Sequence, residues 1–299
     1  MPEELQQALG PLVLLPLMFV VGLQLVVDDF RRVFSAPRAV VGGTLGQLLL
    51  LPLMTWGVVV ALDVSPIFGV GAFLLAATPG AGMSNVMAAV ARADVALSVT
   101  LTAVSSLLAV VTLPTIAALG VSTLIGDSLL VEVPVAAIVQ QLVLFLAIPI
   151  ALGMWVRARR PEASKRYVST ANRVAVVGVL VLTALSALSG ENSLPSGAEF
   201  VRAAVAALVW TLCAMALGWG MGTLLSLGRD QRFTFFIEFS ARNLALTVII
   251  AVAAMGRLDL GLFAAVYGST GFVLVLLVAV FRGRLQAAEV ARGALKKEG

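Results

Sequence analysis

Histidine is absent from this chain of 299 residues, and charged residues make up only 12% of it. Without histidine, the chain lacks the side chain that most often binds metals and acts as a general base at neutral pH. Soluble domains carry about 25% charged residues, whereas this chain is 60% hydrophobic with a mean hydropathy of +1.05. The composition is therefore that of an all-α polytopic membrane protein.

Cysteine is almost as scarce, and Cys213 is the only one. No disulfide can therefore form within the chain. Its apolar surroundings favour a small packing residue. The net charge of +4 comes from basic residues in short loops, so it does not indicate a nucleic-acid partner. The partner that this composition requires is the lipid bilayer.

Nine apolar stretches approach the ~20 residues that a membrane-spanning helix needs. They cover residues 12–27, 39–62, 67–91, 95–119, 135–156, 174–188, 203–227, 233–255 and 260–281. Except for Arg202, Arg242 and Arg257, every lysine and arginine lies after the first, third, fifth or seventh stretch or in the C-terminal tail. Basic loops face the cytoplasm. We therefore expect nine spans, with the N-terminus outside and the C-terminus inside.

The stretches leave no room for a separate soluble domain. We expect one transmembrane domain over residues 1–299, with a basic cytoplasmic tail over 283–299 that forms a helix near anionic lipid. The short tail and the spans rich in alanine and valine favour the plasma membrane of a bacterium.

The third stretch contains Pro79, Gly80 and Gly82 at its middle. Proline removes a backbone donor, and glycine permits unusual dihedral angles. We expect the helix to end near Thr78 and to resume at residues 84–85, a serine and an asparagine that can cap it. Such a break is tolerated at membrane depth only where it is buried in protein or lines a wet cavity. A proline kink packed against a neighbouring helix is the alternative.

The eighth stretch contains Glu238 and Arg242, which lie four residues apart beside Ser240 and Asn243. An ionisable residue at membrane depth costs at least ~2.5–3.5 kcal/mol on insertion scales. The pair therefore marks either a path for substrate or ions, or a structural ion pair between helices.

The third and eighth stretches run in opposite directions, five spans apart. Spans one to four and six to nine then form two halves of opposite topology. An inverted repeat with paired broken helices is typical of secondary transporters. Half-helix N-termini that meet at the midplane suit an anion, and the exposed carbonyls with Glu238 suit Na⁺.

Ser98 and Thr102 lie on one face of the fourth stretch, at a spacing of four residues. Their hydroxyls could coordinate a cation. Alternatively, they bond back to the preceding turn or join helices together.

In this order, the motifs resemble the bile acid:sodium symporter family in a nine-span version, from Leu12 to about Phe281. The matching segments are DDFRRVFSAPRAV, GQLLLLPL, ATPGAGMSN, LSVTLT and EFSARN. The resemblance implies two crossed discontinuous helices in a core domain over about 38–120 and 199–282. It implies a smaller panel domain over about 10–34 and 133–190. Substrate would bind between these domains, and their relative movement would give alternating access.

The resemblance also implies functional residues. The family's first sodium site falls on Ser84, Asn85, Ser98, Thr102 and Glu238, which all match in residue type. The substrate contacts that we expect are Gly82, Met83, Asn85, Arg242 and Asn243.

The family's second sodium site falls on Gln47 and Glu238, with carbonyls near Phe239 and Ala241. Here the sequence departs from the family, because Arg242 replaces a glutamine. A guanidinium only donates hydrogen bonds and cannot bind Na⁺. We therefore expect one sodium site, with Arg242 as a built-in cation in place of the second ion or as a partner for a substrate carboxylate.

The resulting hypothesis is a symporter that carries a small organic anion, either a carboxylate or a bile-acid-like molecule, with Na⁺. If Glu238 and Arg242 neutralise each other, the carrier is independent of Na⁺. An arsenite-type oxyanion permease is a second alternative, although TPGAGMSN lacks the cysteine on which the related arsenical permeases depend. A receptor or scaffold is a third. No nucleophile and base are placed as an intramembrane enzyme would require.

Overall fold

The structure, a computed structural model, is helical and contains no β-strand in the residues that it describes. Those residues are 15–16, 18–20, 22–23, 34–80, 82–124, 140, 143–162, 164, 196–251, 255 and 257–298. The expected sixth span, 174–188, lies outside them, and so does part of the first. Many large apolar side chains on the surface are exposed, as a bilayer environment permits.

The second expected span is a helix with a π-helical turn at its middle. It consists of α3 (Pro37–Leu45), η1 (Gly46–Leu50) and α4 (Leu51–Ala61). The fourth is α7 (Val95–Leu124), which has Pro114 inside it. The seventh is α11 (Gly197–Leu224).

The third and eighth expected spans are each broken into two helices. The third consists of α5 (Pro66–Ala77) and α6 (Gly82–Val90), and the eighth of α12 (Arg229–Ser240) and α13 (Leu244–Ile249). The ninth contains η5 (Leu258–Gly261), α14 (Leu262–Ser269) and α15 (Gly271–Glu298).

In the described part of the chain, three helices are long and apolar enough to cross a membrane by themselves. They cover 37–61, 197–224 and 259–289, and α7 counts as a fourth if its two bent portions form one span. The broken third and eighth spans fail this test because each half is short. The fold is therefore that of an integral, multi-pass membrane protein, while the count of nine, the orientation and the bacterial membrane stay predictions.

The centre of the bundle is α5, whose residues from Phe68 to Ala77 are all buried. α11 packs closely along α12 because its glycines leave room for the neighbouring backbone. A Cβ added to Gly218 would lie 2.4 Å from the carbonyl oxygen of Phe235, and one added to Gly222 would lie 3.0 Å from the Cα of Arg232. This close approach fixes the position of α12.

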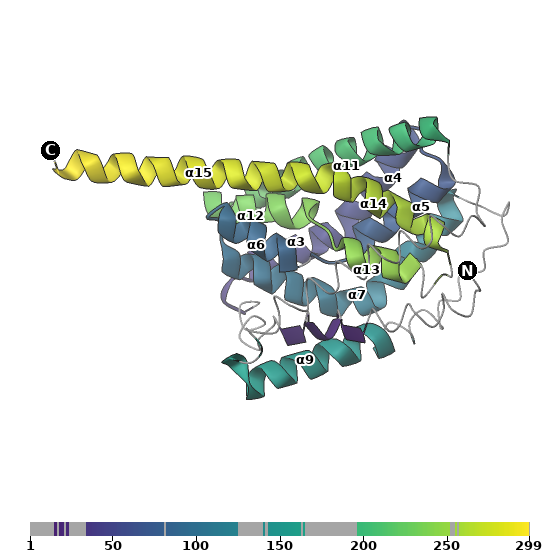
Figure 1. The fold of residues 1–299 in the computed structure, drawn as a ribbon, viewed down its shortest axis with the longest axis horizontal. Coiled ribbons are helices and arrows are strands. Elements are labelled where there is room, and N and C mark those ends of the chain that lie inside the picture. Colours follow the sequence, from purple (N-terminus) through teal and green to yellow (C-terminus); the bar gives the residue numbers. More distant parts are fainter. Residues whose placement is uncertain are drawn as a thin grey trace.

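Glycines also allow the N-terminal segment to pack closely against the fifth expected span. This span contains η3 (Val143–Ala147) and α9 (Ile148–Arg159). A Cβ on Gly22 would lie 2.2 Å from the oxygen of Ile150, and one on Gly153 would lie 2.2 Å from the oxygen of Phe19. In Figure 1 the short purple helical pieces accordingly lie along α9. Both segments fall within the residues expected for the panel domain, which stays a prediction.

At the other end of the chain, α15 extends far beyond the bundle (Figure 1, yellow). Arg282 fastens it to α12, with Nη2 2.6 Å from Oδ1 of Asp230 and the guanidinium 4.1 Å from the ring centroid of Phe233. The expected helix in the basic tail is present, since α15 continues to Glu298.

Candidate functional site

The two broken spans cross at their breaks. Gly80 and Arg242 form an isolated antiparallel bridge, and the N–H of Asn243 donates to the carbonyl oxygen of Pro79 at 3.2 Å. α5 ends one residue before Thr78, as expected, but α6 begins at Gly82, two residues earlier than expected. The expected caps do not act as caps because Ser84 and Asn85 turn toward a polar cluster between the helices.

That cluster surrounds the carboxylate of Glu238 in the last turn of α12, where its side chain is 0% exposed. Ser98 Oγ lies 2.5 Å from Glu238 Oε1, and Thr102 Oγ1 lies 3.1 Å from Oε2. Ser98 Oγ is also 2.8 Å from Oδ1 of Asn85, and Thr102 Oγ1 is 3.5 Å from Oγ of Ser84. Three helices, α6, α7 and α12, thus bring five oxygen-bearing side chains together.

The two hydroxyls of α7 in this cluster each face more acceptors than they can donate to. Ser98 has one hydroxyl hydrogen but lies within reach of two acceptors, Asn85 and Glu238. Thr102 is shared between the same two residues, with Asn85 Oδ1 at 3.5 Å. A hydroxyl donates one bond at a time, so Ser98 and Thr102 can each satisfy only one of the two acceptors within reach. An excess of convergent oxygens is the environment that a hard cation satisfies.

Gly80 forms the wall of this cluster on the side of the helix break. A Cβ at this position would lie 2.6 Å from Glu238 Oε2, 3.0 Å from Thr102 Oγ1 and 3.1 Å from Ser84 Oγ. Any side chain would therefore occupy the space at which the oxygens converge, so the site leaves room only for glycine here.

Arg242 lies in the break between α12 and α13 and is 2% exposed. Each terminal nitrogen of its guanidinium donates two hydrogen bonds to protein oxygens. Nη1 donates to Gln47 Oε1 at 3.1 Å and to the carbonyl oxygen of Glu238 at 3.1 Å. Nη2 donates to the carbonyl oxygen of Ala76 at 3.1 Å and to that of Thr78. The carbonyls at the C-terminal end of α5 and the Gln47 side chain in η1 therefore surround the positive charge.

Although they lie four residues apart, Glu238 and Arg242 do not pair through their side chains. In the described residues, no guanidinium nitrogen comes within 4.0 Å of the Glu238 carboxylate, and Arg242 bonds to the backbone of Glu238 instead. The carboxylate faces the hydroxyl cluster while the guanidinium faces a separate oxygen cage. The pair therefore forms two adjacent sites of opposite charge.

Tyr267 in α14 holds the break in place, a role that the sequence analysis missed. Its hydroxyl donates to the carbonyl oxygen of Ser240 and accepts from the N–H of Arg242 at 3.4 Å. Its ring packs edge-on against Trp210 with centroids 5.6 Å apart. The available signal was a tyrosine, one of only two in the chain, inside an apolar stretch.

The remaining expected substrate contacts lie around the same crossing. Asn243 caps α13, since its Oδ1 accepts from the N–H of Leu246 at 3.0 Å, and it is 7% exposed. Met83 is 43% exposed, and Gly82 and Asn85 are half-buried. The first turn of α6 is therefore the accessible edge of the crossing.

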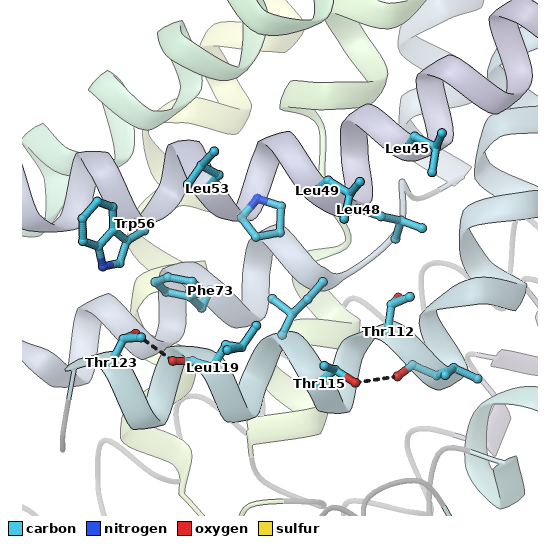
Figure 2. A pocket seen from close by; sticks show the side chains of 13 residues that line it. Leu45, Leu48, Leu49, Leu53, Trp56, Phe73, Thr112, Thr115, Leu119 and Thr123 are labelled. Atoms are coloured by element: carbon cyan, nitrogen blue, oxygen red, sulfur yellow. Dashed lines mark hydrogen bonds between the residues drawn. The ribbon is translucent and has the colours of Figure 1, made fainter. Parts of the chain in front are cut away.

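A separate cavity of about 680 Å³ lies between the helix α3–η1–α4 and α7. Figure 2 shows Leu49, Leu53 and Trp56 on one side and Thr115 and Leu119 on the other. The lining is apolar, and the hydroxyl of Thr115 bonds back to its own helix at 3.2 Å. No member of the Glu238 cluster lines this cavity, so it does not coincide with the polar site.

Comparison with known proteins gives matches over most of the chain. The profile of the Sodium Bile acid symporter family matches residues 11–195. The "Probable sodium/metabolite cotransporter BASS2, chloroplastic" of Oryza sativa subsp. japonica is 29% identical over 79% of this chain and 54% of its own length. The "Uncharacterized sodium-dependent transporter YocS" of Bacillus subtilis is 28% identical over 81% of this chain and 73% of its own.

A mammalian protein is also similar to this chain. The "Sodium/bile acid cotransporter 4" of Rattus norvegicus is 28% identical over 76% of this chain and 52% of its own length. The matched region thus spans about half the length of the rice and rat proteins. All three relatives carry the names of transporters, not of enzymes.

Proposed function

Because this chain belongs to the Sodium Bile acid symporter family, we propose that it is a secondary transporter that moves a small organic anion across the membrane together with Na⁺. The observation that carries this proposal is the convergence of Ser98 and Thr102 on the Glu238 carboxylate, where each hydroxyl faces two acceptors.

The Glu238 cluster is the proposed sodium site. Hard cations take oxygen ligands, and this cluster supplies a carboxylate, an amide oxygen and three hydroxyls. One carboxylate among neutral oxygens balances a single positive charge, which favours Na⁺ over a divalent ion. The ligands would be Ser84, Asn85, Ser98, Thr102 and Glu238.

Arg242 is proposed as a built-in cation in place of a second ion, not as a partner for the substrate. Its terminal nitrogens are already committed to Gln47 and to backbone carbonyls, and the side chain is almost completely buried. A carboxylate of the substrate would have to displace these bonds in order to reach it.

The substrate is proposed to bind at the accessible edge of the crossing. The first N–H groups of a helix have no partner within the helix, so the start of α6 beside Gly82 and Met83 suits an anionic group. At the same crossing, the oxygen of the Asn243 amide is used to cap α13, which leaves its NH₂ group as a donor. Movement of the proposed core domain against the proposed panel domain would then open this edge to each side in turn.

The arsenite-type alternative gains no support from the crossing. The only cysteine, Cys213, lies in α11 and not at either break. A receptor or scaffold would leave the buried Glu238 cluster without a role, and substitutions at Asn243 would then change no flux.

The test is the melting temperature of the purified protein in NaCl and in choline chloride, with and without a library of organic acids. A ligand that binds the folded state raises stability by mass action. We expect Na⁺ to raise the melting temperature of the parent protein and to have little effect on Glu238→Gln. The control is Glu289→Gln, which removes an exposed carboxylate on α15.

Uptake into proteoliposomes provides the second readout, with the same organic acids as substrates. We expect a rise with external Na⁺ that Glu238→Gln abolishes. Full uptake without Na⁺, together with equal melting temperatures in the two salts, would contradict the proposed sodium site.

A further inference from the structure

We infer that Arg242 makes the unloaded carrier electrically neutral, so that one Na⁺ crosses with one singly charged anion and the cycle moves no net charge. This inference rests on the proposed Na⁺ symport at the Glu238 cluster. It specifies two properties that the proposed function leaves open. These are the charge of the substrate and the energy source, which is the Na⁺ concentration gradient without the membrane potential.

In the part of the chain that the structure describes, Glu238 and Arg242 are the charged residues that are buried, at 0% and 2% exposure. With the carboxylate and the guanidinium both ionised, their sum is zero. An arginine remains charged in proteins, so the positive member of the pair is permanent.

This positive charge cannot leave the site. The guanidinium is covalently attached to the chain and is held by Gln47, by the carbonyls of Ala76 and Thr78 and by the backbone of Glu238. It contacts the ends of both broken helices, and it therefore moves with them. A free ion in the same cage would cross the membrane in each cycle, but Arg242 does not.

The net charge of the site differs between the states of the transport cycle. The empty site has no net charge, and Na⁺ alone gives it one uncompensated positive charge at membrane depth, which is costly. Na⁺ with a monoanion restores neutrality, whereas Na⁺ with a dianion leaves one negative charge. The carrier exposes its site to the opposite side most easily when the site is neutral. The substrate class is therefore a monocarboxylate.

The oxygen cage around Arg242 would be empty without the guanidinium. The oxygens of Gln47, Ala76, Thr78 and Glu238 would then surround a space beside an uncompensated carboxylate. Carbonyls at the ends of broken helices coordinate Na⁺ in transporters. Replacing Arg242 by a neutral side chain is thus expected to admit a second mobile cation and to make transport of a monoanion electrogenic.

The experiment measures the uptake of radioactive Na⁺ into proteoliposomes at zero potential and at about 100 mV, inside negative, set with potassium and valinomycin. The probes are a pool of monocarboxylates (pyruvate, lactate and cholate) and a pool of dicarboxylates (succinate and malate) near neutral pH. One elementary charge moved through 100 mV changes the accumulation ratio roughly 50-fold. For the parent protein we expect stimulation by the monocarboxylate pool and no change in accumulation with potential.

Two outcomes would overturn the inference while the symport itself stands. One is stimulation by the dicarboxylate pool alone, and the other is monocarboxylate accumulation that increases tens of fold with the potential. Absence of any Na⁺ uptake coupled to either pool would instead contradict the proposed function.

A pair of variants that differ in charge isolates the role of Arg242. In Arg242→Gln we expect monocarboxylate-driven Na⁺ uptake to become sensitive to potential and the ratio of Na⁺ to anion to rise from one to two. Arg242→Lys retains a tethered cation, so we expect its Na⁺ uptake to be insensitive to the membrane potential, as in the parent protein. Sensitivity to potential in both variants, or in neither, would contradict the assigned role, and the parent measurement decides even if a variant fails to fold.

Discussion

The backbone N–H of Asn243 donates to the carbonyl oxygen of Pro79 at 3.2 Å, across the crossing of two helices that lie far apart in sequence. With the bridge between Gly80 and Arg242, this contact pairs backbone groups that the two breaks would otherwise leave unsatisfied. Unpaired backbone groups are costly at membrane depth. Each break therefore stabilises the other, and the polar site lies where they meet.

Gly80→Ala tests how closely the break contacts the proposed sodium site. The added Cβ would lie 2.6 Å from Glu238 Oε2, so the cluster must shift. We expect the affinity for Na⁺, measured from the salt dependence of the melting temperature, to fall by roughly 10-fold or more, equivalent to about 1.4 kcal/mol. The control is Gly57→Ala, because a Cβ at this α4 position meets no atom within 4 Å. Unchanged Na⁺ affinity in Gly80→Ala would contradict this account.

Ser98→Ala and Thr102→Val remove one oxygen each from the cluster. Changes to the partners that orient metal ligands reduce metal affinity by roughly 10–100-fold, and we expect losses at least that large for these proposed direct ligands. The measurement is again the melting temperature across a NaCl series. Thr115→Val is the control on the same helix, since this hydroxyl bonds only to Val111 of its own turn. Equal losses in all three variants would indicate a general effect on α7 and not a site.

Tyr267→Phe tests the clamp on the second break. The variant keeps the ring against Trp210 but removes the hydroxyl that donates to Ser240. A buried carbonyl left without a donor costs about 1–3 kcal/mol, so we expect a melting temperature several degrees lower in the absence of Na⁺. Ser269→Ala, on the same helix, removes an exposed hydroxyl and should change little. A parent-like melting temperature for Tyr267→Phe would show that the clamp is dispensable.

Gly218→Ala tests the packing that positions α12 and therefore Glu238. Its Cβ would lie 2.4 Å from the backbone oxygen of Phe235, which cannot move without shifting the helix. Overpacking typically costs about 1–3 kcal/mol, and we expect a lower melting temperature together with weaker stabilisation by Na⁺. Gly220→Ala, two residues further along α11, meets no atom within 4 Å. Similar results for the two variants would contradict the proposed role of this helix contact.

The residues of the site show how far local sequence can be interpreted. Pro79 and Gly80 predicted the break after Thr78 because proline and glycine act on their own backbone. The start of α6 was misplaced by two residues, since Ser84 turns toward Thr102 in another helix instead of capping its own. Local capping preference was outweighed by a contact between helices.

The sequence by itself determined the membrane environment and the chemistry that is available within it. The apolar composition, the break at Pro79 and the presence of Glu238 and Arg242 at depth all follow from residue type and spacing. Tertiary structure alone decided that the guanidinium of Arg242 turns away from its neighbour Glu238 toward Gln47 and the end of α5, and that Tyr267 clamps Ser240. The reason is physical, since these hydrogen bonds join segments whose approach is set by helix packing, and no local pattern specifies which helices will meet.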